Sequence, residues 1–239
     1  MIRMIRSYNV YTSKIIVTLA HILFPLLILT IIPSVTFFMR NSDVGIIDST
    51  LKVLSGCVVI YVLVVNILAD RFSIGTILVN NSQTNELLKS SSKGEGMLLN
   101  VAVWDIFVRL FSAAAIFLGI FIARINYRQG RVSSLLAMML LCIISTHCMS
   151  SLLSWICRKI ESIALSSLIM GFGSLLMIPV TMISVFPVKE MPSWIILPTT
   201  AVYLVGDVIV NVVGMLLLKR FIKNEWYKDS SRKDNEDET

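Results

Sequence analysis

Two pairs of polar residues stand four positions apart inside long apolar runs of the sequence. The first pair is Asp105 and Arg109, and the second is Asp207 and Asn211. Asn66 is a further polar residue within such a run. Residues four apart lie on one face of a helix, so each pair can interact locally. Polar side chains in long apolar segments are costly to bury and are often functional, which makes these five residues the first candidates for a site.

The acidic residue precedes the basic one in the pair Asp105 and Arg109, which is the favourable order for an ion pair along a helix. The apolar run that follows, 110–123, is about 21 Å long at about 1.5 Å per residue, too short to cross a membrane. Arg109 is therefore expected inside the bilayer, with Asp105 near its inner edge. An isolated Arg there would cost about 2.5–3.5 kcal/mol. We predict a structural ion pair, and a role in gating or coupling is the alternative.

Asp207 and Asn211 have no basic partner in their own apolar run, and Asn66 lies near the inner end of another run. Hydrogen bonds between helices of a packed bundle would satisfy these side chains. The alternative is that they line a polar translocation path.

Residues for catalysis or cofactor binding form no recognisable set. His21 and His147 have no Asp or Glu at helical spacing, and Cys142 and Cys148 point to separated faces of a helix. No glycine is followed by lysine, so the phosphate-binding loop of an ATPase is missing from the sequence. We predict that the chain is not an enzyme and that it has no catalytic, metal or cofactor site.

The composition is that of a membrane protein. Of the 239 residues, 56% are hydrophobic and 15% are charged, against about 45–50% and about 25% in soluble domains. Six apolar runs reach about 20 residues, the length that a helix needs to cross the hydrocarbon core. They lie near 15–39, 51–69, 104–123, 133–156, 163–186 and 195–218. These runs do not alternate as a membrane barrel requires, and backbone in lipid must bond within itself. The predicted fold is all-α, a polytopic protein of the cell membrane with six transmembrane helices.

The distribution of Lys and Arg predicts the orientation of these helices. Most of the 21 basic residues fall in four places, the N-terminal segment 1–14, an arm at 70–96, the pair at 158–159 and the tail 219–239. We therefore predict that both termini and the arm are cytoplasmic, which puts the basic connection 124–131 on the outer side. The net charge of +6 is accounted for in this way, and no nucleic acid is expected as a partner.

Both terminal segments suit contact with lipid. Segment 1–14 alternates apolar and basic residues, as in a helix that lies in the membrane interface; the alternative is a charged flank that only orients the first span. The tail begins with basic and aromatic residues typical of an interfacial anchor and ends with a composition typical of disorder.

Ala115, Gly119 and Ala123 form a ridge of small residues in the third run. Such ridges allow helices to approach closely. We expect this one to pack within the subunit, and a dimer seam is the alternative.

The arm 70–96 is the longest polar stretch between two spans. It holds a helical patch from Glu86 to Lys89 with an adjacent pair, Leu87 and Leu88. Exposed leucines on a short helix suit docking to a partner. An ordinary loop with an incidental pair of leucines is the alternative.

Six spans, an interfacial N-terminal segment and a cytoplasmic arm that begins "DRFSIGT" together resemble the drug, peptide and polysaccharide export permeases of ABC transporters. In that family an acidic residue, then Gly-Thr, then a short Leu-rich helix before the third span form the coupling helix, which sits in a groove of the ATPase subunit. The resemblance implies that these parts are Asp70, Gly75 and Thr76, followed by Glu86, Leu87, Leu88 and Lys89. Within the family, "HILFPLL" and "MPSWIILP" are similar to lantibiotic-type peptide export and immunity permeases.

The resemblance implies a transport subunit of an ATP-driven exporter that carries a peptide or an amphipathic small molecule and contributes to antimicrobial resistance. Such a subunit pairs with a like or related permease, and two separate ABC ATPase subunits use the ATP. The alternative is an ATP-independent membrane protein, such as a bacteriocin immunity or sensor-partner protein.

Overall fold

The structure is a computed structural model that describes residues 22–38, 90–126, 132–157, 165, 168–169, 172 and 193–226. Its long helices are α3 (Phe24–Phe38), α7 (Gly94–Asn126), α8 (Val132–Cys157) and α11 (Ser193–Phe221), and α11 continues into a π-helical turn at Ile222–Trp226. No strand occurs among the described residues. The all-α prediction is confirmed for this part of the chain.

Three of these helices are long and apolar enough to cross a membrane, as judged by length and composition. They are α7, α8 and α11, whereas α3 is a shorter apolar helix in its described part. The bounds of α8 differ from the predicted span 133–156 by one residue at each end. The chain is thus a helical protein with membrane-spanning segments, as its composition predicts.

The helix α7 is longer than the predicted span 104–123, and it begins ten residues before the predicted start. It begins after a turn in which the Gly94 N–H donates to the Ser91 carbonyl oxygen at 3.0 Å. Glu95 in the first turn suits the positive end of the helix dipole. At about 1.5 Å per residue α7 is about 50 Å long, which exceeds the roughly 30 Å hydrocarbon core.

The early start of α7 follows from packing rather than from hydropathy. Leu98, Val101 and Ala102 are buried against Leu218 and Ile222 at the end of α11. Because of this contact, the first three turns of α7 bury an apolar face against α11. The helix forms there although Gly94, Gly96 and Asn100 interrupt the apolar run.

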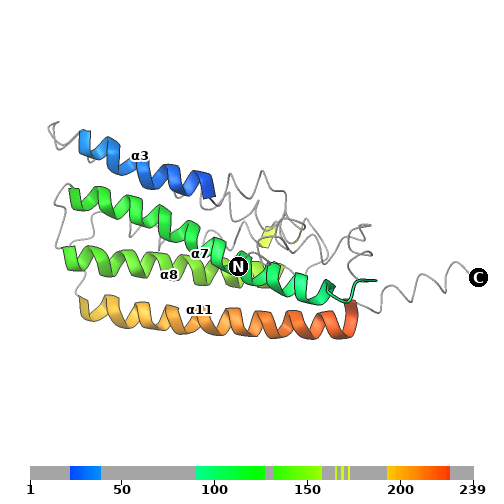
Figure 1. The fold of residues 1–239 in the computed structure, drawn as a ribbon. Helices are drawn as coiled ribbons and strands as arrows, with labels where there is room; N and C mark the ends of the chain where they lie inside the picture. Colours follow the sequence, from blue (N-terminus) through cyan, green and yellow to red (C-terminus); the bar gives the residue numbers. More distant parts are fainter. Residues whose placement is uncertain are drawn as a thin grey trace, which may run out of the picture.

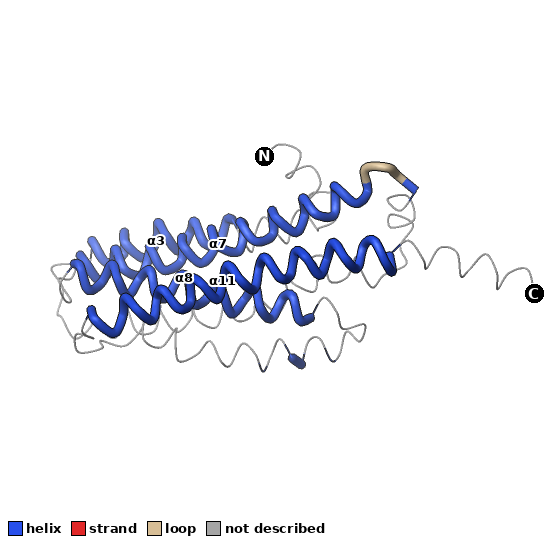
Figure 2. Tube along the Cα trace, turned by 90° about the horizontal axis from the view of Figure 1, so that it is seen from below, coloured by secondary structure: helices blue, strands red, loops and turns tan. Residues whose placement is uncertain are grey.

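The helices lie side by side along one direction (Figures 1 and 2). α3 packs on α7, α7 packs on α8, and α8 packs on α11. The main core lies between α3, α7 and α8, where Ile28 and Ile32 meet residues such as Ile116, Phe117 and Ile120.

α3 and α7 run in the same direction, and α8 and α11 run in the opposite one (Figure 1). The end of α3 and the start of α7 therefore lie toward opposite ends of the bundle, and so do the end of α8 and the start of α11. The predicted spans 51–69 and 163–186 lie between these helices in the sequence. Apart from residues 165, 168–169 and 172, both predicted spans lie outside the described residues, so the count of six helices stays a prediction.

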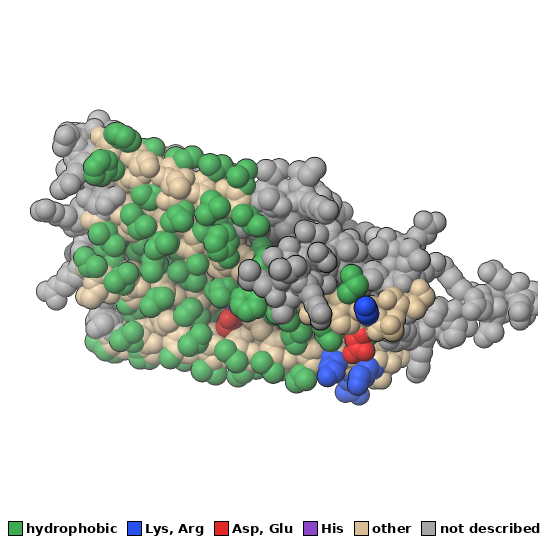
Figure 3. Space-filling model, viewed as in Figure 1, with side chains coloured by type: hydrophobic (Ala, Val, Ile, Leu, Met, Phe, Trp, Pro, Cys, Tyr) green, Lys and Arg blue, Asp and Glu red, His purple; other side chains and the backbone are tan. Residues whose placement is uncertain are grey.

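Charged side chains gather at the end of the bundle where α7 begins and α11 ends (Figure 3). The described charged residues in these turns are Lys93, Glu95, Lys219, Arg220 and Lys223. Near the opposite end of α7, Arg124 is buried, with its guanidinium 5.8 Å from the centre of the Phe121 ring. Exposed basic charge on these helices is thus concentrated at one end.

The ridge of small residues lies against α3, as predicted for packing within the subunit. A Cβ atom at Gly119 would lie 3.0 Å from the carbonyl oxygen of Ile28 and 3.0 Å from the Cα atom of Leu29. Ala115 and Ala123 are buried on the same helix. The backbones of α3 and α7 approach so closely that a side chain at position 119 would require the backbone of α3 to shift by a few tenths of an ångström.

The outer face of α11 is apolar and exposed, as Figure 3 shows along the length of the helix. Val202, Val205, Val208, Ile209 and Leu216 are each more than half exposed. The hydroxyl groups of Thr199 and Thr200 are satisfied within the helix, since each donates to the carbonyl oxygen four residues earlier. Such a face suits contact with lipid, in which every polar backbone group needs a partner within the protein.

Candidate functional site

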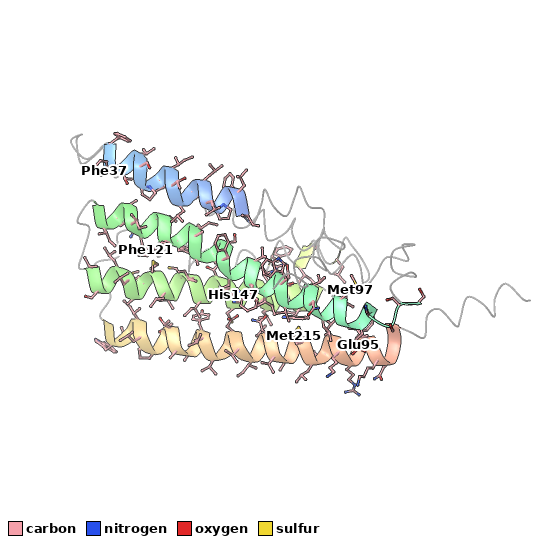
Figure 4. The ribbon with its side chains drawn as sticks, in the orientation of Figure 1. Phe37, Glu95, Met97, Phe121, His147 and Met215 are labelled. Atoms are coloured by element: carbon pink, nitrogen blue, oxygen red, sulfur yellow. The ribbon has the colours of Figure 1, made fainter. Side chains whose placement is uncertain are left out.

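Polar side chains from three helices meet between α7, α8 and α11. We call this group the polar seam; it consists of Asp105 and Arg109 on α7, His147, Ser150 and Trp155 on α8, and Asp207 and Asn211 on α11. Figure 4 places His147 midway along the bundle. The seam therefore lies well inside the segments that can cross the membrane.

The first part of the seam is the predicted ion pair. Arg109 Nε donates to Asp105 Oδ2 at 3.0 Å, and the side chains are only 3% and 2% exposed. Arg109 Nη1 also donates to Ser150 Oγ on α8 at 3.1 Å. A buried pair of opposite charges with added hydrogen bonds offsets much of its desolvation cost, and the bond to Ser150 ties α7 to α8.

The second part of the seam joins all three helices through His147. Its Nδ1 lies 2.9 Å from Oδ1 and 2.8 Å from Oδ2 of Asp207 on α11. Its Nε2 lies 3.1 Å from the backbone carbonyl oxygen of Ile106 on α7. The imidazole is 2% exposed and the Asp207 side chain 16% exposed. The His147 ring thus links the Asp207 carboxylate on α11 to the Ile106 carbonyl oxygen on α7.

The third part of the seam surrounds the Asp207 carboxylate on α11. Asn211 Nδ2 donates to Asp207 Oδ1 and to the Asp207 carbonyl oxygen, both at 3.0 Å. Trp155 Nε1 donates to Asn211 Oδ1 at 3.3 Å. The Trp155 ring lies against Gly214, where a Cβ atom would overlap it. The absence of a side chain at Gly214 therefore gives the indole the space to reach Asn211.

The face of α8 that contributes to the seam is a polar stripe. Residues three and four apart share one face of a helix, and His147, Ser150, Ser151, Ser154 and Trp155 follow that spacing. All three serines are buried. Within the described part of the chain, the hydroxyls of Ser151 and Ser154 have no hydrogen-bond partner. They add polar groups to an interior that is otherwise apolar.

The chemistry that the seam can support is the holding of charge within a hydrogen-bonded network. It contains two carboxylates, one guanidinium and one imidazole, all in hydrogen-bonded pairs. No group of three or more His, Cys, Asp or Glu side chains that could hold a metal ion occurs among the described residues. Ionisable groups at this depth are typical of substrate, ion or proton pathways.

Sequence reasoning found four members of the seam and missed the residue at its centre. The ion pair between Asp105 and Arg109 forms as predicted. Asp207 and Asn211 do make bonds between helices, and the basic partner that Asp207 lacks on its own helix is His147 on α8. The signal in the sequence was that His147 and Asp207 each lie about halfway along an apolar run. The pair was missed because partners were sought only three or four residues away on the same helix.

The predicted coupling residues lie outside the described residues, and so does Asn66. They are Asp70, Gly75, Thr76, Glu86, Leu87, Leu88 and Lys89. Of the arm 70–96, the structure describes residues 90–96, which form the turn before α7 and its first residues.

Comparison with models of known protein families, with curated proteins and with solved structures gives no match.

Proposed function

We propose that the chain is the membrane-spanning permease subunit of an ATP-driven exporter of the ABC type. In this proposal two permeases, identical or related, form the translocation path, and separate ATPase subunits dock on the cytoplasmic arm 70–96. The cargo is a peptide or an amphipathic small molecule. Closure of the ATPases on ATP would push the arms, and the permeases would alternate access to the path between them.

The observation that carries the proposal is the concentration of exposed basic charge at one end of the bundle. The start of α7, which includes the last residues of the arm, lies at that end together with Lys219, Arg220 and Lys223 at the end of α11 and in the turn that continues it. Basic residues next to membrane spans favour the cytoplasmic side. This supports an arm that faces the cytoplasm, where an ATPase subunit can reach it.

The length of α7 supports a mechanical link between the arm and the membrane interior. The helix runs without a break from Gly94 past the polar seam to Asn126. Movement of the arm would be transmitted along one rigid element to Asp105 and Arg109, and from there to α8 through Ser150. A docking arm fused to a long helix is thus suited to coupling.

The proposal is tested by purification of the tagged protein in mild detergent. We expect an ATPase subunit to co-purify, and we expect it to be lost when Leu87 and Leu88 are both replaced by Asp, because the two charges would enter an apolar groove of the partner. Membrane levels should be unchanged, since the substitutions lie outside the predicted spans. The matched control replaces Val79 and Asn80 by Asp and should retain the ATPase.

The other possible results of this co-purification experiment would change the proposal or contradict it. Loss of the ATPase in the Val79 and Asn80 variant alone would put the docking helix earlier in the arm. Absence of any ATPase from the parent preparation, or its retention in both variants, would contradict the proposal. The first of these results would favour an ATP-independent immunity or sensor-partner protein.

A further inference from the structure

The hydrogen bonds of His147 determine how many protons its surroundings require. The Ile106 carbonyl oxygen, 3.1 Å from Nε2, can only accept a hydrogen bond, so Nε2 carries a hydrogen. On the other side of the ring, Nδ1 lies within 2.9 Å of both oxygens of Asp207. An unprotonated Nδ1 would set its lone pair against an ionised carboxylate. A second proton is therefore needed between the ring and Asp207.

We propose that His147 and Asp207 together form a proton-binding site within the membrane, which holds one proton on Nδ1 while α8 and α11 are in contact. The position of the proton follows from the carboxylate. Both of its oxygens face Nδ1, and Oδ1 also accepts a hydrogen bond from Asn211 Nδ2 at 3.0 Å. An ionised carboxylate can accept from the Nδ1–H group at both oxygens, whereas a carboxylic acid would donate to Nδ1 from one oxygen and set the lone pairs of the other oxygen against the lone pair of the same nitrogen.

The charge balance of the polar seam requires the same proton. Among the described residues of the seam, Asp105 is paired with Arg109 at 3.0 Å, so Asp207 is the remaining acid. With the proton bound these described residues carry no net charge, and without it they would carry one negative charge in a largely apolar interior, which is unfavourable.

No other described group near the site supplies a positive charge in place of the proton. The remaining titratable side chains on the facing stretches of α8 and α11 are Cys142, Cys148 and Tyr203, which are neutral or negative in either state. α3 has no titratable residue. On α7, the guanidinium beside the site is that of Arg109, and it is engaged by Asp105.

The bound proton is linked to the packing of the helices. When α8 and α11 separate, the imidazole loses the carboxylate that favours its charged form. Because linkage is reciprocal, proton binding favours contact between the helices, and separation of the helices favours release of the proton. The site goes beyond ATP-driven export, since it would bind its proton whether or not an ATPase docks on the arm.

Nitrogen NMR of the full-length protein in lipid nanodiscs tests the site directly. The chain has two histidines, so His21→Gln leaves His147 as the single labelled ring. In spectra recorded at pH 8, we expect each ring nitrogen of His147 to carry a hydrogen, because Nε2 faces the Ile106 carbonyl oxygen and Nδ1 faces the Asp207 carboxylate. In the variant that also carries Asp207→Asn, we expect Nδ1 to lose its proton and Nε2 to keep its hydrogen.

A crosslink shows whether the Asp207→Asn variant keeps its helix contact. A Cβ atom at position 206 would lie 3.6 Å from Cys148 Sγ, so Gly206→Cys should crosslink to Cys148 when the other three cysteines are replaced by Ala. Val205→Cys, on an exposed face of α11, is the control that should not crosslink.

An unprotonated Nδ1 in the parent protein at pH 8 would overturn the proposal, and this result needs no variant at Asp207. A crosslinked Asp207→Asn variant in which Nδ1 stays protonated would also overturn it, because the carboxylate would then not hold the proton. Neither result bears on whether an ATPase co-purifies, so the two proposals fail independently.

Discussion

At the scale of residues, the buried polar groups of the seam are explained by the partners that they have. Asp105 and Arg109 form an ion pair within one helix, and His147 and Asp207 form a hydrogen-bonded pair between two helices. An unpaired charge in such a place would cost several kcal/mol. The seam is therefore sensitive to the removal of one partner and much less sensitive to the removal of both.

The ion pair gives a direct test of this view. Asp105→Ala removes the carboxylate that faces the Arg109 guanidinium and should lower the stability of the protein by about 3–5 kcal/mol. Asp105→Ala combined with Arg109→Leu should recover most of that loss, because no charge is left buried. Thermal unfolding in detergent, followed by the monodisperse fraction, measures both effects. A double variant no more stable than the single one would show that Asp105 acts in its own right.

At the scale of elements, the helices are held by two kinds of contact. α3 meets α7 through a close backbone approach at Gly119, whereas α8 meets α7 and α11 through the polar seam. Without a hydrophobic driving force between helices in lipid, small residues and hydrogen bonds supply most of the specificity. Both kinds of contact occur on the side of each helix that faces its neighbours.

The glycines of α7 allow the backbone contact to be tested with a matched control. Gly119→Val should lower stability by about 1–3 kcal/mol, because overpacking forces the backbone of α3 to move. Gly96→Ala should leave stability unchanged or raise it by about 0.5–1 kcal/mol, since nothing lies within 4 Å of a Cβ there and Ala favours a helix. Thermal unfolding of both variants decides the matter. Equal stability of the Gly119→Val variant and the parent would contradict the packing of α3 on α7.

At the scale of the whole molecule, the bundle is asymmetric from end to end. Exposed basic charge lies where α7 begins and α11 ends, and the face between the ends that Figure 3 shows is mostly apolar, with an acidic side chain midway along it. This is the pattern expected of a protein with a defined orientation in the membrane. The orientation determines which partners can reach the arm.

Labelling from outside the cell tests the orientation. In a background without native cysteines, Cys introduced at Ser91 or Ser230 should not react with a membrane-impermeant maleimide, because both positions are predicted to be cytoplasmic. Cys at Asn41 or Met191 should react, because both are predicted to lie outside. Reaction at Ser91 in intact cells would reverse the orientation and remove the coupling role of the arm.

The sequence alone determined the features that depend on local order along the chain. A long apolar run must become a helix in lipid, because its backbone groups have no other partners, and α8 accordingly matches its predicted bounds closely. The pair of Asp105 and Arg109 was predictable for the same reason, since 3.6 residues per turn place residues four apart on one face. Both predictions need only the geometry of a single helix.

The tertiary structure decided which helices are neighbours and which faces they turn to each other. His147 and Asp207 are 60 residues apart, and no local spacing relates them; they meet because α8 packs on α11 with both residues at the same depth. The early start of α7 has a similar origin, because the end of α11 covers Leu98 and Val101. Helical periodicity specifies positions around one axis, whereas the rotation of each helix and its choice of neighbour depend on packing along the whole bundle.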